Sequence, residues 1–211
     1  MLTNPTRTAT VRPMSPNDAR LSHRDRQRLE TREKLFALAV DEIAASGIDR
    51  ADVRRIAEAA GVARGTFYFH FATKADVLLE LQRREIDRIV DDLEASPAAG
   101  LGDVLDSVVT EVLASERRLG ASLFRDMVSV NFGRATSTAE QVETNRLVEY
   151  MARAATAALD EGSLRDDVEP VEFAAIALVG LFGLLAASRG PNAGRDDLAQ
   201  RYVDTILRGS Q

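Results

Sequence analysis

The sequence of 211 residues contains no cysteine and no tryptophan, and its only histidines are His23 and His70. Without cysteine the chain cannot form a disulfide scaffold, a thiolate zinc site, an iron–sulfur cluster or a cysteine nucleophile. Two histidines also exclude a multi-histidine metal centre and leave little material for a histidine-dependent catalytic triad. We therefore expect no metal, no cofactor and no catalytic residues, and an enzyme is the least favoured class.

Proline is scarce as well, and its positions separate the beginning of the chain from the rest. Three of the six prolines lie within residues 1–27, which are polar and show no apolar periodicity. This segment has no apolar stretch of the kind found in signal peptides, and we interpret it as a disordered basic tail. Its arginines have the chemistry to reach into a DNA groove, but a plain leader is the favoured interpretation. Beyond it, long stretches rich in Ala, Leu, Glu and Arg predict an all-α fold.

Long hydrophobic runs are nearly absent too. The longest spans residues 173–188, which is 16 residues and falls short of the roughly 20 that a membrane-spanning helix needs. A buried helix fits this run better. We expect no membrane partner and a cytoplasmic location.

Positive charge is concentrated at the start of an acidic chain. The net charge is -6, but residues 1–74 carry 13 Arg and Lys against 9 Asp and Glu, a net charge of +4. Residues 75–211 carry 14 against 24, a net charge of -10. This asymmetry favours a polyanionic partner for the first part alone. Chance scatter of a few charges is the alternative.

Apolar periodicity predicts four helices in the first half of the chain, over residues 28–46, 53–60, 63–69 and 74–95. A glycine follows each of the first two, as is typical where a helix ends. The second and third helices are too short to be stable alone and must pack against a neighbour. Joined by a sharp turn at Gly61, they form a helix–turn–helix, in which the later helix enters a DNA major groove.

Residues 32–78 resemble the DNA-binding domain of TetR-family transcriptional regulators. The resemblance is carried by a dozen residues at fixed offsets: Ile56, Ala57, Ala60, Gly61, Val62, Gly65, Thr66, Phe67, Tyr68, His70, Phe71 and Lys74. It covers under a quarter of the chain. It implies a three-helix DNA-binding domain over residues 28–74, a helical ligand-binding and dimerisation domain over residues 75–211, and a homodimer.

Candidate DNA contacts cluster on and around the third helix. They are Arg54, Arg55, Arg64, Gly65, Thr66, Tyr68, Phe69, His70 and Lys74. Arg64 can bind a guanine in bidentate fashion, and Thr66 can contact a base or a thymine methyl group. The resemblance implies that Tyr68, His70 and Lys74 hold phosphates, which fixes the register without reading sequence.

Two residues depart from the family pattern. Asp52 stands where the family usually has Thr or Ser, and although aspartate still caps a helix, its charge repels a phosphate. Ala63 stands where serine is frequent, and alanine is a poor cap that weakens the third helix by about 1 kcal/mol. Both put nearby DNA contacts in doubt.

The second half of the chain carries no recognisable motif. Its periodicity predicts helices near residues 101–118, 120–133, 137–161, 170–189 and 196–208. The resemblance implies a ligand pocket here, and its candidate lining is Leu123, Phe124, Met127, Val128, Asn131, Phe132, Leu147, Tyr150 and Met151. These residues are equally suited to a core. A small hydrophobic or cationic ligand is the corresponding hypothesis.

A dimer surface is predicted on the last two helices. The run at residues 173–187 is apolar all round, so it must be covered on both sides, by its own domain and by a second subunit. The candidate interface residues are Gly180, Phe182, Gly183, Leu184, Leu198, Tyr202 and Ile206. The alternative is a monomer with one fully buried central helix.

The combined prediction is a TetR-like repressor that a small molecule releases from a palindromic operator. The alternative is a DNA-binding regulator or architectural protein that has no small-molecule ligand.

Overall fold

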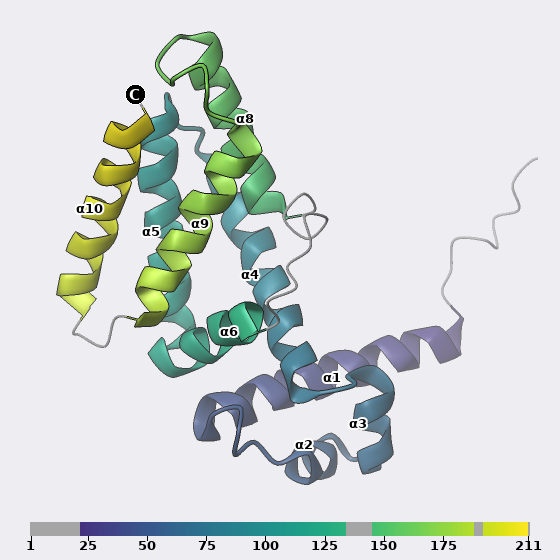
Figure 1. The fold of residues 1–211 in the computed structure, drawn as a ribbon. Coiled ribbons are helices and arrows are strands. Elements are labelled where there is room, and N and C mark those ends of the chain that lie inside the picture. The colour runs from purple at the N-terminus through teal and green to yellow at the C-terminus, as the bar shows by residue number, and fades with distance from the viewer. Residues whose placement is uncertain (1–21, 134–144, 188–191, 211) are drawn as a thin grey trace, which may run out of the picture.

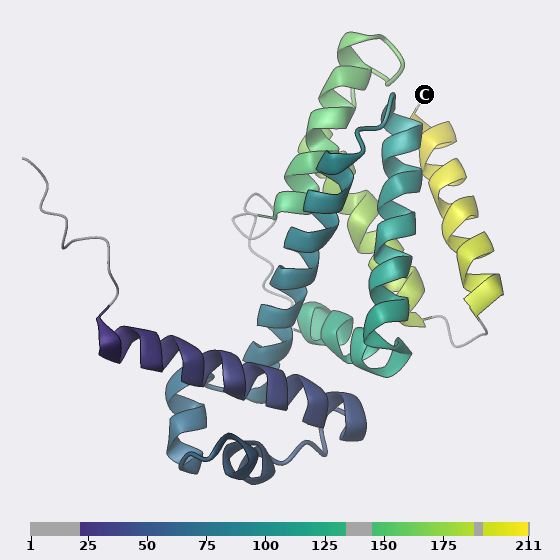
Figure 2. The same cartoon turned by 180° about the vertical axis from the view of Figure 1, so that it is seen from behind.

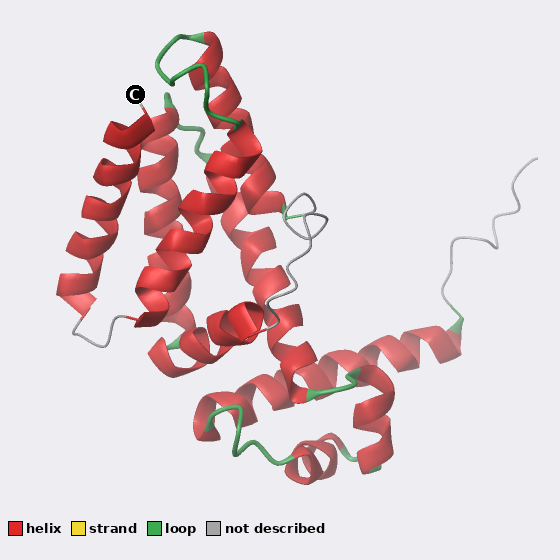
Figure 3. Ribbon diagram, in the orientation of Figure 1, coloured by secondary structure: helices red, strands yellow, loops and turns green. Residues whose placement is uncertain are grey.

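The computed structural model describes residues 22–133, 145–187 and 192–210, and every regular element in these ranges is a helix (Figure 3). The elements are α1 (His23–Ser46), α2 (Val53–Ala60), α3 (Arg64–His70), α4 (Lys74–Ala95), α5 (Leu101–Leu119), α6 (Ala121–Gly133), α8 (Arg146–Asp160), α9 (Pro170–Ala187) and α10 (Asn192–Ser210). The predicted all-α class is confirmed. Residues 1–21 of the predicted tail lie outside the described residues.

The helices form two parts that α4 connects (Figure 1). Helices α1, α2 and α3 make a small unit at one end, which we call the head. Helices α5, α6 and α8 pack against α4 and, together with α9 and α10, make a larger unit, which we call the body. Helix α6 lies across the bottom of the body, between the other body helices and the head, as both views show (Figures 1 and 2).

Local caps fix where the head helices begin and end. Helix α2 begins at Asp52, whose side chain accepts a hydrogen bond of 2.8 Å from the backbone N–H of Arg54. It ends at Gly61, which adopts a left-handed φ of 74° that side-chain-bearing residues rarely take. Helix α4 opens with a reciprocal capping box between Thr73 and Asp76. These ends agree with the predicted boundaries to within a residue.

Helix α1 begins five residues earlier than predicted, at His23 instead of Arg28. Its first turn is capped by Ser22, whose hydroxyl accepts a hydrogen bond of 3.1 Å from the N–H of Asp25. Residues 23–27 were predicted to belong to the disordered tail, and that part of the prediction is wrong. The apolar pattern starts late because this end of α1 is exposed on all sides.

An aromatic cluster holds the head together and orients α3. The side chain of Phe67 is fully buried, and its ring centroid lies 5.8 Å from that of Phe71, which lies 6.4 Å from that of Phe36. Burying a phenylalanine contributes on the order of 2 kcal/mol. With Phe67 directed inwards, the opposite face of α3 must point to solvent.

Ion pairs join the head to α4. The carboxylate of Glu80 accepts hydrogen bonds from Arg32 of α1 and from Arg84, and Arg84 also pairs with Glu33 of α1. Burial alone would raise the pKa of Glu80, but the hydrogen bonds from the two arginines outweigh it and lower the pKa to about 2. The carboxylate therefore stays charged over the physiological pH range and ties α4 to α1.

Helix α6 provides a second connection between head and body. The side chain of Asp126 accepts a hydrogen bond of 3.0 Å from the backbone N–H of Ile48, in the turn that joins α1 to α2. Helix α6 is therefore bonded to the head directly, in addition to the connection through α4.

Helix α9 is apolar all round but is covered on only one side within the chain. Its length and composition alone would allow it to cross a membrane, and a third of its residues are buried. The buried side packs against the other body helices. On the outer side, Val171, Ile176 and Val179 are between 36% and 58% exposed. This half-covered arrangement is the one predicted from its composition.

Candidate nucleic-acid interface and apolar cavity

The outer face of α3 presents aromatic and cationic side chains to solvent. Tyr68 is 43% exposed and Phe69 is 66% exposed, which is unusual for large aromatic residues in a core-forming helix. Arg64 begins the helix and is exposed. A Cβ atom added to Gly65 would meet no atom within 4 Å, so the backbone at this point is open to a close approach. Thr66 is half-buried beside it.

Arg64 and Tyr68 form a pair along this face. The Arg64 guanidinium donates a hydrogen bond of 3.3 Å to the Tyr68 hydroxyl and lies 5.5 Å from the centroid of its ring. No acidic partner of Arg64 occurs among the described residues. The pair therefore offers a full positive charge and several free N–H donors, which suits a guanine edge or a phosphate.

A shallow hollow lies between α2, α3 and the start of α4. It is lined by the cations Arg50, Arg54, Arg64 and Lys74 and by the single carboxylate of Asp52. Tyr68, Ala51 and Val53 complete its walls. Four cations against one anion make this hollow electropositive, and such a surface attracts an anion such as a phosphate group.

Three of the predicted contacts already have partners within the chain. Arg54 pairs with Asp52 at 3.1 Å, and Arg55 pairs with Glu42 at 3.4 Å. The hydrogen bond from the Arg54 side chain lowers the pKa of Asp52, so its negative charge persists at neutral pH. Lys74 donates to two backbone carbonyls of the turn before α2, at 3.0 and 3.1 Å. Lys74 thus has a structural role besides any contact with DNA.

His70 lies at the end of α3 and is half-buried. Burial, followed by the nearby charges of Arg28 and Arg32, lowers the pKa of His70 below its usual value of 6.5. At neutral pH the ring is therefore uncharged and can act as a hydrogen-bond donor but not as a cation.

Ala63 provides no side-chain cap to α3, as predicted from its residue type.

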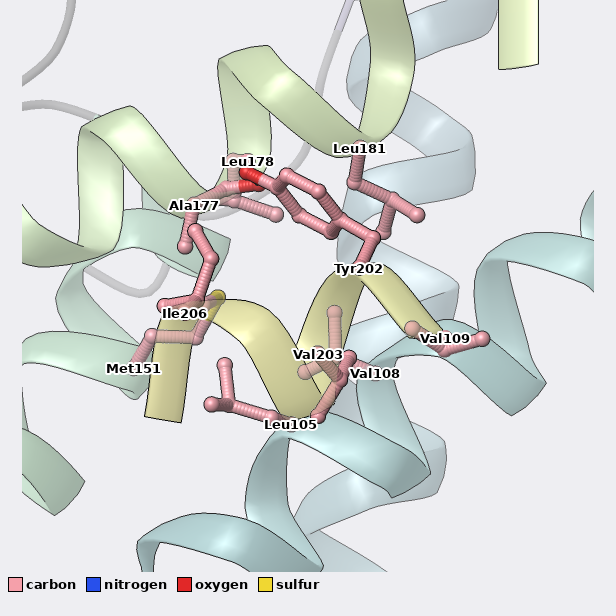
Figure 4. A pocket seen from close by; sticks show the side chains of 10 residues that line it. All are labelled: Leu105, Val108, Val109, Met151, Ala177, Leu178, Leu181, Tyr202, Val203 and Ile206. Carbon is pink, nitrogen blue, oxygen red and sulfur yellow. The ribbon is translucent and has the colours of Figure 1, made fainter. Parts of the chain in front are cut away.

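The body contains a small apolar cavity (Figure 4). Its volume is about 10 Å³, which is room for about one water molecule. Helices α5, α8, α9 and α10 supply its lining: Leu105, Val108, Val109, Met151, Ala177, Leu178, Leu181, Tyr202, Val203 and Ile206. The hydroxyl of Tyr202 is the only polar side-chain group among them, and it donates to the carbonyl of Ala177 at 2.9 Å.

The cavity and the predicted ligand lining share only Met151. Five other predicted lining residues are buried in the continuous core, namely Leu123, Phe124, Met127, Val128 and Leu147. Tyr150 is half-buried against this core. The side chains of Asn131 and Phe132 lie outside the described residues. The sequence could not identify the cavity because its walls come from helices far apart in the chain.

The predicted dimer residues divide between the inside and the outside of the body. Tyr202 and Ile206 line the cavity, and the Tyr202 ring lies directly over Gly180, where a Cβ atom would collide with it. Gly180 therefore serves a contact within the chain. Gly183 has no atom within 4 Å of an added Cβ and faces outwards.

The remaining predicted dimer residues, Phe182, Leu184 and Leu198, are partly buried. The most exposed apolar residues of α9 are Ile176 and Val179, which the prediction omitted. Their three-residue spacing was the signal that could have identified them.

Comparison with known proteins connects these features to a family. Residues 35–81 match the family model described as bacterial regulatory proteins, tetR family. The chain is 34% identical over 61 residues to a fatty acid metabolism regulator protein of Bacillus subtilis, which covers 29% of this chain and 31% of that protein. It is 30% identical over 96 residues to the HTH-type transcriptional regulator AcrR of Shigella flexneri, covering 42% and 45%. Both matches thus span less than half of the relative's length.

Solved structures share the fold over most of the chain. The FadR repressor of Thermus thermophilus, solved in complex with lauroyl-CoA, superposes with a TM-score of 0.64 at 22% identity, over 84% of this chain and 91% of that one. The fatty acid degradation regulator FadR of Bacillus halodurans gives 0.60 at 20% identity, over 85% and 95%. The head therefore matches the tetR family model over residues 35–81, and the chain shares the fold of these two solved regulators over most of its length.

Proposed function

We propose that the protein is a transcriptional repressor that binds a palindromic DNA operator as a homodimer and leaves it when a small apolar molecule occupies the body. The observation that carries the proposal is the outer face of α3. It is an exposed helix surface with an arginine that has no acidic partner among the described residues, exposed aromatic side chains and an adjoining electropositive hollow. These are the features of a helix that enters a DNA major groove.

The exposed side of α9 supports a homodimer. Val171, Ile176 and Val179 present an apolar strip that water would otherwise cover, and Gly183 lets a neighbouring helix come close. A second copy of the chain would bury the same strip about a twofold axis. Such a dimer would place its two α3 helices in successive major grooves, about 34 Å apart.

The cavity supports an apolar ligand. Apart from the Tyr202 hydroxyl its lining offers no polar side chain, so an uncharged or acyl-chain-like molecule fits it better than a cation. A relative of the same fold was solved with lauroyl-CoA, whose acyl chain has this chemistry. Because the empty cavity has room for about one water molecule, a ligand must push α10 or Tyr202 outwards to enter.

Two connections would carry the ligand signal to the head. One is α4, held to α1 by Glu80, and the other is the bond from Asp126 of α6 to the turn at Ile48. A ligand that favours a different spacing of the two heads by 1–3 kcal/mol would weaken operator binding roughly 5- to 150-fold. Operator DNA would weaken ligand binding by the same factor.

The small volume of the cavity favours a second candidate function, a DNA-binding regulator without a small-molecule ligand. The two candidates differ in thermal stability. A ligand-responsive protein melts at a higher temperature with a suitable apolar compound, and lauroyl-CoA is the first compound to test. A regulator without a ligand shows no shift with lauroyl-CoA or with other acyl compounds.

Fluorescence anisotropy on a duplex from the DNA upstream of the protein's own gene tests DNA binding. Wild type is expected to bind it in the presence of unrelated competitor DNA. Thr66→Ala and Tyr68→Ala are each expected to weaken binding roughly tenfold, since each removes a base or phosphate contact. Thr110→Ala on α5 is the matched control, because Thr110 is exposed in the body and only bonds its own helix.

Binding that all three variants leave unchanged would contradict the placement of the interface on α3. If wild type binds neither this duplex nor an unrelated one at low salt, the proposed function itself is wrong, because even non-specific DNA binding depends on the same cationic surface.

A further inference from the structure

The early start of α1 has no role in the packing of the head. Its first turns are exposed, and they extend past α3 at the edge of the head (Figures 1 and 2). Arg24, Arg28 and Arg32 follow one another at four-residue spacing and so lie on one face of this helix. Like charges at this spacing repel each other and destabilise a helix. The stability of α1 therefore does not explain why three arginines lie on one face, and an interaction outside the helix is the better explanation.

Only one of the three arginines is neutralised. Arg32 pairs with Glu80 of α4. Neither Arg24 nor Arg28 has an acidic partner in the part of the chain that the structure describes. Two unpaired cations on an exposed helix face therefore stand free to bind an anion.

Arg28 is held in place by α3. Its guanidinium lies 5.2 Å from the ring centroid of Phe69, which is the most exposed large hydrophobic residue of the described chain. A guanidinium that lies over an aromatic face keeps its N–H donors free at the edge of its own plane, so it can still bind a phosphate oxygen. This contact accounts for the exposure of Phe69, because its ring serves as a platform that orients Arg28.

The position of this pair complements the pair at the other end of α3. Arg64 with Tyr68 lies at the start of the helix, and Phe69 with Arg28 lies at its end. When a helix sits in the major groove, both of its sides face a sugar–phosphate strand. An arginine at each end can then contact the two strands that flank the groove.

We propose that Arg28 of α1, seated on Phe69, binds the phosphate backbone beside the major groove that α3 enters, and that Arg24 extends this contact by one turn. The inference rests on the proposed DNA-binding function. It assigns Arg28 of α1, which is absent from the contacts predicted from the sequence, to the interface. It also assigns Phe69 a positioning role in place of a base contact.

Anisotropy titrations at several salt concentrations test the proposal on two duplexes of equal length, the upstream DNA and an unrelated sequence. Arg28→Gln is expected to weaken binding to both duplexes by the same factor, about 5-fold, because a phosphate contact is independent of sequence. The slope of log K against log salt should also decrease in magnitude by about 0.9, which corresponds to one lost phosphate contact. Phe69→Leu keeps the apolar bulk but removes the platform, and should give a smaller loss of the same kind.

Arg165→Gln is the matched control, since Arg165 is an exposed arginine in the body that pairs only with its neighbour Asp167. Melting temperatures of all three variants check that the fold is intact. If Arg28→Gln binds both duplexes with the affinity and salt slope of wild type while Thr66→Ala weakens binding, the inference is wrong and the proposed function stands. If Arg28→Gln weakens only the upstream duplex, Arg28 reads bases and the phosphate assignment is wrong.

Discussion

The head and the body treat charge in opposite ways. Among the described residues, the side chains that α1, α2 and α3 bury fully are all apolar, and no charged side chain of the head is among them. The body and α4 bury three charged side chains, Glu85, Glu116 and Arg195. The head is thus a small apolar core with a charged exterior that is available for the proposed DNA contacts, whereas the body uses some of its charges in buried ion pairs.

This difference predicts where single substitutions act. A charge removed from the head should change binding and leave stability nearly unchanged, because surface charges contribute little to folding. A charge removed from the interior of the body should cost stability, because its partner is left buried and unpaired. Three substitutions test this contrast, from a large effect on stability to almost none.

The largest effect is expected from the ion pair between Glu116 of α5 and Arg195 of α10. Both side chains are less than a tenth exposed, and Arg195 also donates a hydrogen bond of 2.6 Å to the carbonyl of Leu185 at the end of α9. Glu116→Ala leaves the arginine charge buried, and it should lower the free energy of unfolding by about 3 kcal/mol. Chemical denaturation measures the loss, with the exposed Asp204→Ala on α10 as the control.

Replacing both partners sharpens this test. A Glu116→Leu, Arg195→Met double variant removes the unpaired charge, so it should recover most of the stability that Glu116→Ala loses. A double variant as unstable as the single one would show that packing and the bond to Leu185, instead of the unpaired charge, account for the loss.

An intermediate effect is expected at the joint between the two parts. The pKa of Glu80 is lowered to about 2 in the folded chain, against an ordinary value of 4.5 for a glutamate in water. Its contribution to stability is therefore complete above pH 4.5 and is lost as the pH falls towards 2. Glu80→Gln should cost about 2 kcal/mol at pH 7, after a discount for partial exposure, and less than half of that at pH 3.

Denaturation of wild type and Glu80→Gln at both pH values measures this difference, and Glu30→Gln, an exposed residue of α1, is the control. A constant difference between pH 7 and pH 3 would mean that the ionisation of Glu80 does not stabilise the joint.

How much of the fold can be predicted from the sequence depends on whether the signal for an element lies within a few residues. The boundaries of α2, α3 and α4 could be predicted to within a residue because their signals are local: a capping side chain, a glycine in the left-handed region, a capping box. Helix α10 begins at Asn192, four residues before its predicted start at residue 196, because no apolar periodicity marks its first turn. The start of α1 was missed for the same reason.

The candidate sites show more clearly that sequence patterns predict local features but not contacts between separate helices. The face of α3 follows from a motif within a few residues, so its exposed positions could be predicted. The cavity could not, since it needs Leu105, Met151, Leu178 and Tyr202 to meet across four helices. The pairings of Lys74 with the turn and of Arg28 with Phe69 were missed because they also join separate elements.

The smallest effect on stability is expected in the head, at the residue that departs most from the family pattern. Asp52 caps α2 and holds Arg54 in an ion pair, and it is the only carboxylate in the electropositive hollow. Serine can accept the same hydrogen bond from the N–H of Arg54, so Asp52→Ser should melt at nearly the temperature of wild type. It removes one negative charge beside the expected phosphates and releases Arg54, so DNA binding should become about 3-fold tighter at low salt.

Asp204→Ser makes the same change in net charge on α10 and should leave binding unchanged. If both variants tighten binding equally, the gain comes from net charge, and the hollow is not where DNA lies; if Asp52→Ser alone does so, the head of this chain binds DNA through the hollow in spite of its aspartate.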